Sequence, residues 1–181
     1  MTESGDEATD RSSTWPSGSA PGVVVGDLLE QTDVEALVNP WNRNFVPRHL
    51  LLAGGVSGQL KKVTGPQPWI ELAKHGLLPV GGVVITGGGR WPQRLIHVAG
   101  LTATWRATPD GVRLSAANVI RAAHAAGIAS MAMALIGAGH GRLSPTSALD
   151  AVLAGLDDVA ELTRQLQIRI VLHPNDAGIL P

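Results

Sequence analysis

The stretch "NPWNRNFVPRHLLLAGGVSGQLKK", residues 39–62, decides the fold of this chain. It begins where an apolar segment of strand length ends and finishes in a polar segment with helical spacing. Pro40 stops strand pairing, and the Asn42 carboxamide both donates and accepts, which suits a ribose diol. Glycines 54, 55 and 58 then let backbone amides approach an anion where a helix begins. Taken alone, the stretch fits a ligand site and an asparagine turn followed by a glycine-permitted bend equally well.

Apolar segments of strand length alternate with longer helical patterns on both sides of this stretch. We expect six strands, at 23–27, 35–40, 81–86, 94–100, 130–137 and 168–174. We expect helices at 47–65, 66–76, 110–127 and 144–166, where apolar residues recur at i, i+3 and i+4. The last helix carries a stripe that we assign to the core: Leu149, Leu153, Leu156, Val159 and Leu162. The alternation predicts an α/β fold with a largely parallel sheet and helices on both faces.

Composition limits the domain count and the classes of site. The chain has 181 residues, of which 44% are hydrophobic and 16% charged, which predicts one globular domain at 22–181 after a disordered tail at 1–21. The net charge of −1 gives no overall positive field for nucleic acid, although a local basic groove remains open. There is no cysteine, and the six histidines lack zinc-site spacing, so we expect neither metal nor cofactor.

Targeting signals are also missing from the sequence pattern. No apolar run reaches the length of a membrane span, and the first residues lack the order of a signal peptide. We therefore expect a cytoplasmic protein.

Two further segments follow expected strand ends, where ligands collect in open α/β sheets. In "VVVGDLL", Asp27 can accept a hydrogen bond from an exocyclic amine such as that of adenine or cap the next helix, and we favour the cap. In "MALIGAGHGRLSP", three alternating glycines permit a backbone nest for a diphosphate, with Ser144 as cap of the following helix; a flexible connection is the alternative. We read "VVITGGGRWP" as a turn between neighbouring strands. For His97 we favour a satisfied core or rim histidine over a catalytic base.

Taken in order, these segments resemble a macrodomain, the ADP-ribose-binding fold. The resemblance covers residues 23–172 and rests on "GDLL", "DVEALVNPWN", "GGVSG", "LIHVAG" and "LIGAGHGRL". It implies a three-layer α/β/α sandwich whose six-stranded sheet is mixed. The binding residues that it implies are Asp27 and Leu28 for adenine, Asn39 and Asn42 for the distal ribose region, Gly54, Gly55, Val56 and Ser57 for the first diphosphate loop, and Ile136, Gly137, Ala138, Gly139, His140, Gly141 and Arg142 for the second.

The sequence departs from the family at two catalytic positions. The aspartate that many members carry after Gly-Gly-Val is Ser57 here, and a hydroxyl cannot replace an ionised base. The lysine that some members use near the end of the fourth strand is also absent. We therefore expect hydrolysis assisted by position and charge, with a departing anion stabilised by Arg106 or Arg142. The catalytic candidates are Asn42, Ser57, Gln59 and His140.

The short second glycine loop and the segment "TWRATPD" resemble macrodomains that remove ADP-ribose from glutamate or from thymidine in DNA. The sequence thus predicts a monomeric ADP-ribosyl hydrolase, similar to antitoxins, acting on ADP-ribosylated protein or single-stranded DNA away from membranes. A reader module that binds ADP-ribose without chemistry is the alternative. A nucleotide-phosphate hydrolase is disfavoured, because no carboxylate cluster for Mg²⁺ lies near the loops.

Overall fold

A computed structural model describes residues 20–42 and 55–180. Six strands form one sheet in the order β1-β6-β5-β2-β4-β3. The strands are β1 (Gly22–Val25), β2 (Ala36–Trp41), β3 (Val83–Thr86), β4 (Arg94–Ala99), β5 (Ser130–Ala134) and β6 (Gln167–Leu172). All neighbours are parallel except β3, which runs antiparallel to β4. The predicted strand count and largely parallel, mixed sheet are confirmed, as is the turn at residues 87–93 between neighbouring strands.

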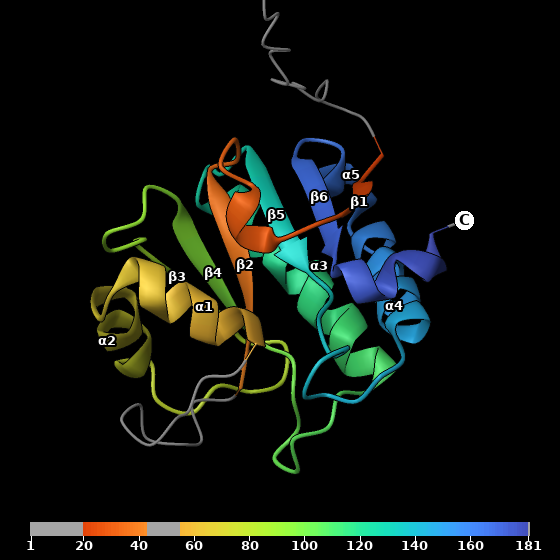
Figure 1. Cartoon of the computed structure of the whole chain (residues 1–181), viewed down its shortest axis with the longest axis horizontal. Coiled ribbons are helices and arrows are strands. Elements are labelled where there is room, and N and C mark those ends of the chain that lie inside the picture. Colours follow the sequence, from red (N-terminus) through yellow and green to blue (C-terminus); the bar gives the residue numbers. More distant parts are fainter. Residues whose placement is uncertain (1–19, 43–54, 181) are drawn as a thin grey trace, which may run out of the picture.

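Helices cover both faces of the sheet, as expected (Figure 1). They are α1 (Gly55–Thr64), α2 (Gln67–Ala73), α3 (Pro109–Ala125), α4 (Pro145–Asp157) and α5 (Ala160–Thr163), with 3-10 turns η1 (Leu28–Glu30) and η2 (Pro174–Ile179). The pleat of β2 shows how the layers are divided. Ala36 and Val38 pack into the core shared with α3 and α4, whereas Leu37 and Trp41 pack into the core shared with α1 and α2.

The two helices that follow the central strands begin at strong caps. The Thr108 side chain accepts from the Gly111 N–H at the start of α3, and Ser144 accepts from the Ser147 N–H at the start of α4, as its sequence position predicted. Proline occupies the first helical position in both cases, where its missing N–H costs nothing. These caps fix where the loops from β4 and β5 end.

The last predicted helix differs from the structure. It breaks at Val159, whose φ of −130° and ψ of 37° are not helical, so α4 and α5 are separate. Leu153, assigned to the core, is 38% exposed, and that assignment was wrong. The reason is that α4 packs on α3 through a face containing Gly155, where a Cβ would overlap the Arg113 carbonyl oxygen. This close approach turns Leu153 outward.

Some boundaries also shift, and some expectations lie outside the described residues. β5 ends at Ala134 rather than 137, because the chain turns at residues 136–141. The expected helix start at 47–54, Gly54 and most of the 1–21 tail lie outside the described residues, and the single-domain limits of 22–181 stay a prediction. In the described part of the chain, no helix is both long and apolar enough to cross a membrane.

Candidate ligand-binding site

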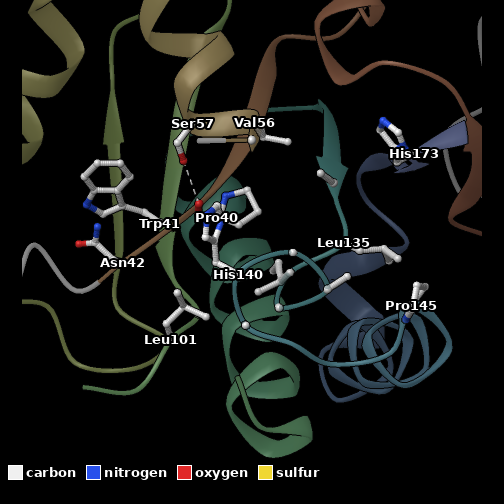
Figure 2. A pocket seen from close by; sticks show the side chains of 18 of the residues that line it. Pro40, Trp41, Asn42, Val56, Ser57, Leu101, Leu135, His140, Pro145 and His173 are labelled. Atoms are coloured by element: carbon white, nitrogen blue, oxygen red, sulfur yellow. Dashed lines mark hydrogen bonds between the residues drawn. The ribbon is translucent and has the colours of Figure 1, made fainter. Parts of the chain in front are cut away.

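A pocket of about 560 Å³ opens at the carboxyl ends of β2, β5 and β6 (Figure 2). This is where ligands bind in open α/β sheets, and the volume is that of a small-molecule site. Its described lining is Pro40, Trp41, Asn42, Gly55, Val56, Ser57, Gly100, Leu101, Trp105, Ala134, Leu135, Ile136, Gly137, Ala138, Gly139, His140, Gly141, Pro145, Val171, His173 and Asp176. The structure therefore brings together both predicted glycine loops and Asn42.

The first wall is the N-terminal turn of α1. Gly55 has a φ of +58°, a conformation that glycine adopts readily, and Val56 and Ser57 follow it along the pocket. The first N–H groups of a helix have no acceptor within the helix, and the helix dipole adds partial positive charge there. This wall can therefore bind an anion without a charged side chain.

The second wall is the loop after β5. Two hydrogen bonds close it, from the Leu143 N–H to the Gly137 carbonyl (3.2 Å) and from the Arg142 N–H to the Gly139 carbonyl (3.1 Å). Within the described residues, no acceptor faces the consecutive N–H groups of residues 138–141. Such a row of free N–H groups is a backbone nest for an anion.

Asn42 carries a buried polar atom without a partner. The residue follows β2 and is only 7% exposed, and its Oδ1 makes no hydrogen bond within the described part of the chain. A buried carbonyl oxygen left unpaired is destabilising, so such atoms in native proteins call for a partner. Because Asn42 lines the pocket, a ligand hydroxyl is the natural donor.

A chain of hydrogen bonds runs through the sheet behind the pocket. The Ser57 hydroxyl donates to Asn39 Oδ1 (2.7 Å), and Asn39 Nδ2 lies 3.0 Å from His97 Nδ1. His97 Nε2 lies 3.0 Å from Thr86 Oγ1, whose hydroxyl donates to the Gly87 carbonyl (3.0 Å). Asn39 and His97 are register partners on β2 and β4, which places both side chains on one face. We call these four side chains the buried relay.

The buried relay has one consistent direction. Asn39 uses its oxygen on Ser57, so its amide donates to His97 Nδ1, and the imidazole proton is then on Nε2. Burial lowers the pKa of His97 from 6.5 to about 3, so the ring is neutral near pH 7. The predicted core role of His97 is confirmed. Ser57, whose proton is engaged, can only accept a hydrogen bond from a ligand or water.

Several predicted site residues do not line the pocket. Asn39 is fully buried within the relay, and Gln59 is exposed on α1, two residues beyond Ser57. Arg142 is exposed just past the second loop. Asp27 and Leu28 lie at η1: Asp27 is the N-cap, accepting from the Leu29 N–H at 2.9 Å, which confirms the favoured cap interpretation, and Leu28 is buried in the core.

Replacing Asp27 with alanine should therefore lower the free energy of unfolding by about 1 kcal/mol, the usual loss for an N-cap. Urea unfolding measures it. An Asp27→Ser control retains a capping oxygen and should keep near-normal stability while shortening the side chain. If Asp27→Ser weakens adenine selectivity of a bound nucleotide at normal stability, Asp27 contacts the ligand as well.

Sequence reasoning missed the aromatic wall and the far end of the pocket. Trp41 packs against Trp69, with ring centroids 5.1 Å apart, so the wall at the end of β2 is firmly held. At the opposite end, His173 caps η2 and Asp176 follows within it. Figure 2 shows His173 standing well apart from Asn42 along the pocket. The position of "HP" directly after the last strand was the available signal.

The described lining has few ionisable side chains. It contains no lysine or arginine, and its single carboxylate is that of Asp176. No group of histidine and acidic side chains that could hold a metal ion occurs within the described ranges. An anion in this pocket would thus be bound mainly by backbone N–H groups.

A model of the Macro domain family matches residues 38–152, more than half of the chain. The chain belongs to the macro domain family. The same fold is found in the Oceanobacillus iheyensis macrodomain solved with ADP, at 25% identity and a TM-score of 0.69, over 87% of this macrodomain and 85% of that chain. It is also found in the Trypanosoma brucei macrodomain solved with ADP-ribose, at 21% identity and a TM-score of 0.67, over 87% and 66% of the two chains.

A curated relative shares more sequence with this macrodomain. It is an uncharacterized protein of Aeropyrum pernix, 36% identical over 130 residues, which are 67% of this chain and 62% of the relative. The match spans less than two thirds of the relative's length. Its description names neither a family nor an activity, so this likeness assigns none to the macrodomain.

Proposed function

We propose that this macrodomain binds the ADP-ribose part of a modified macromolecule and hydrolyses the bond that attaches it. The substrate is mono-ADP-ribose on thymidine in DNA or on an acidic protein side chain. The observation that carries the proposal is the unpaired, buried Oδ1 of Asn42 in the same pocket as two sets of free backbone N–H groups. A ribose hydroxyl and a diphosphate complement these groups.

The pocket chemistry supports the following position for each part of the ligand. The diphosphate lies between the N-terminus of α1 and residues 138–141, and the distal ribose lies at Asn42. Adenosine then extends toward the β6 end, where Val171 offers an apolar surface and Asp176 a carboxylate that can accept from the adenine amine. The attached group leaves the pocket beside Asn42.

Hydrolysis requires water at the anomeric carbon of the distal ribose. The bond from this carbon to the attached group breaks, the water oxygen forms the new bond, and the electron pair leaves with the carboxylate or the thymine anion. Ser57 Oγ accepts a hydrogen bond from the water, since its own proton is engaged. His140 extends from the second loop toward the end of β2 and can take the water proton (Figure 2). The bound diphosphate stabilises the positive charge of the oxocarbenium-like transition state.

The test compares release of ADP-ribose by the wild type, by His140→Gln and by His173→Gln, from a glutamate-linked protein and from a thymidine-modified oligonucleotide. We expect His140→Gln to lower kcat by about 100-fold or more, the usual contribution of a general base, with little change in ADP-ribose affinity. His173→Gln, at the adenosine end, should alter KM and leave kcat near normal. Equal effects of the two substitutions on kcat would rule out His140 as the base.

One observation favours the alternative function, a reader module that binds ADP-ribose and does not hydrolyse its attachment. The single described carboxylate of the lining, Asp176, lies in η2 at the far end from Asn42, so no described acid can serve as base at the distal ribose. Under this second candidate, the wild type binds ADP-ribose in calorimetry and releases none from either substrate.

A further inference from the structure

The loop between β4 and α3 presents a large apolar side chain to the pocket mouth. Trp105 lines the pocket and is 41% exposed, although tryptophan is usually well buried. Its φ is 60°, in the left-handed region that side chains with a Cβ rarely adopt. Conformations of this kind persist where the surrounding structure enforces them, and they concentrate at binding sites.

A second residue with this backbone conformation lies at the same place. Arg142 has a φ of 61°, and it and Trp105 are the non-glycine residues with positive φ in the described ranges. The Ala107 N–H donates to the Gly141 carbonyl at 3.0 Å, which joins the two loops directly beside Arg106 and Arg142. Both arginines are exposed, and no ion pair engages either one within the described residues. We call Trp105, Arg106 and Arg142 the pocket lip.

The pocket lip lies at the end of the pocket where Asn42 is. The Gly100 N–H donates to the Trp41 carbonyl at 3.2 Å, which ties the start of this loop to the residue before Asn42. The Trp105 N–H then donates to the Thr102 carbonyl at 3.1 Å, and the Thr102 N–H donates to the Arg106 carbonyl at 2.8 Å. These bonds hold Trp105 in a closed turn beside the exit for the group attached to the distal ribose.

We propose that Trp105 stacks on the nucleobase that carries ADP-ribose in single-stranded DNA, and that Arg106 and Arg142 contact the flanking phosphates. This inference rests on the proposed function and narrows its substrate to DNA. An exposed aromatic ring beside cationic side chains is the combination that binds single strands, because every base has a face to stack and every linkage a charge. An ADP-ribosylated acidic side chain, by contrast, offers no aromatic ring on which Trp105 could stack. Because the chain has a net charge of −1, the electrostatic attraction for DNA phosphates comes from the pocket lip alone and not from the protein as a whole.

The experiment measures dissociation constants by fluorescence anisotropy and calorimetry for free ADP-ribose, a thymidine-ADP-ribosylated oligonucleotide and a glutamate-linked ADP-ribosylated peptide. We expect Trp105→Ala to weaken oligonucleotide binding by roughly 5- to 100-fold, the effect of losing one stacked base, and to leave the other two ligands within about twofold. Trp105→Phe should retain most of the oligonucleotide affinity. Arg106→Ala and Arg142→Ala should each reduce the slope of log Kd against log salt by roughly 0.7.

Two controls make the test specific. Leu77, 57% exposed and outside the pocket, is replaced by alanine to remove apolar surface elsewhere, and this variant should bind all three ligands normally. Trp105→Gly removes the ring without placing a Cβ in the left-handed region, so it should match Trp105→Ala in binding with no loss of melting temperature. Unchanged oligonucleotide affinity in Trp105→Ala, or an equal loss for the peptide, overturns the DNA inference alone. Failure of the wild type to bind free ADP-ribose overturns the proposed function as well.

Discussion

Replacing Gly139 with valine is expected to abolish ADP-ribose binding while leaving the protein as stable as the wild type. A Cβ at this position would meet no atom within 4 Å, and Gly139 lines the pocket, so the new side chain would fill space that the diphosphate requires. It would also keep the ligand from the neighbouring N–H groups. Calorimetry with ADP-ribose should show affinity reduced by at least about 100-fold, since the nest contributes several hydrogen bonds to a charged group.

Gly137, only two residues away, provides the matched contrast. Its φ is +89°, and a Cβ there would lie 2.7 Å from Ala107 Cβ and 2.9 Å from a Val112 methyl carbon, both in the core. Gly137→Val should therefore unfold at lower temperature, and any loss of binding would follow from damaged packing. If Gly139→Val binds ADP-ribose normally, the second loop does not hold the diphosphate.

Acid should destabilise the protein through His97 well above the range where carboxylates protonate. The pKa of His97 is about 3 in the folded state and about 6.5 when the chain is unfolded. Between these values the unfolded state binds a proton that the folded state does not, so stability is complete above pH 6.5 and falls as the pH decreases. The slope approaches about 1.4 kcal/mol per pH unit below the unfolded pKa, which gives a loss of roughly 2 kcal/mol between pH 6.5 and 4.5. Urea unfolding at several pH values measures it.

The control for this prediction is His97→Gln, which cannot titrate and should lose the His97 slope while being less stable at pH 7. The window stops at pH 4.5 because Asp33, whose pKa is lowered by its hydrogen bonds to Arg169, adds its own loss near and below its ordinary value of 3.8. Equal slopes in the wild type and in His97→Gln would show that another group causes the acid sensitivity.

The sequence predicted the sheet and both glycine loops because these depend on local features. The features are the hydrophobic periodicity of each segment and the glycine and proline residues at its ends. The patterns could not separate Asn39 from Asn42, which lie three residues apart. The pleat and the register with β4 turn Asn39 inward to His97, whereas Asn42 lies past the strand end. Only the paired strand reveals this difference.

The other errors have the same origin in contacts between distant segments. Leu153 fits a helical stripe, but the position of α3 selects the face of α4 that is buried. Gln59 follows Ser57 by two residues in α1, and the turn of the helix carries it away from the pocket. The segment "TWRATPD" indicated this loop, but a single sequence does not show the backbone conformation and exposure that single out Trp105 within it.

The far end of the pocket has a separate consequence for how this protein could acquire new selectivity. The family match ends at residue 152, whereas Val171, His173 and Asp176 come after it. Ile179 packs against the core, but none of the η2 residues is fully buried, so substitutions elsewhere in η2 leave the sheet and both cores intact. Under the proposed placement of adenosine, the nucleoside preference would therefore change with substitutions in this short turn, independently of the two loops proposed to bind the phosphates.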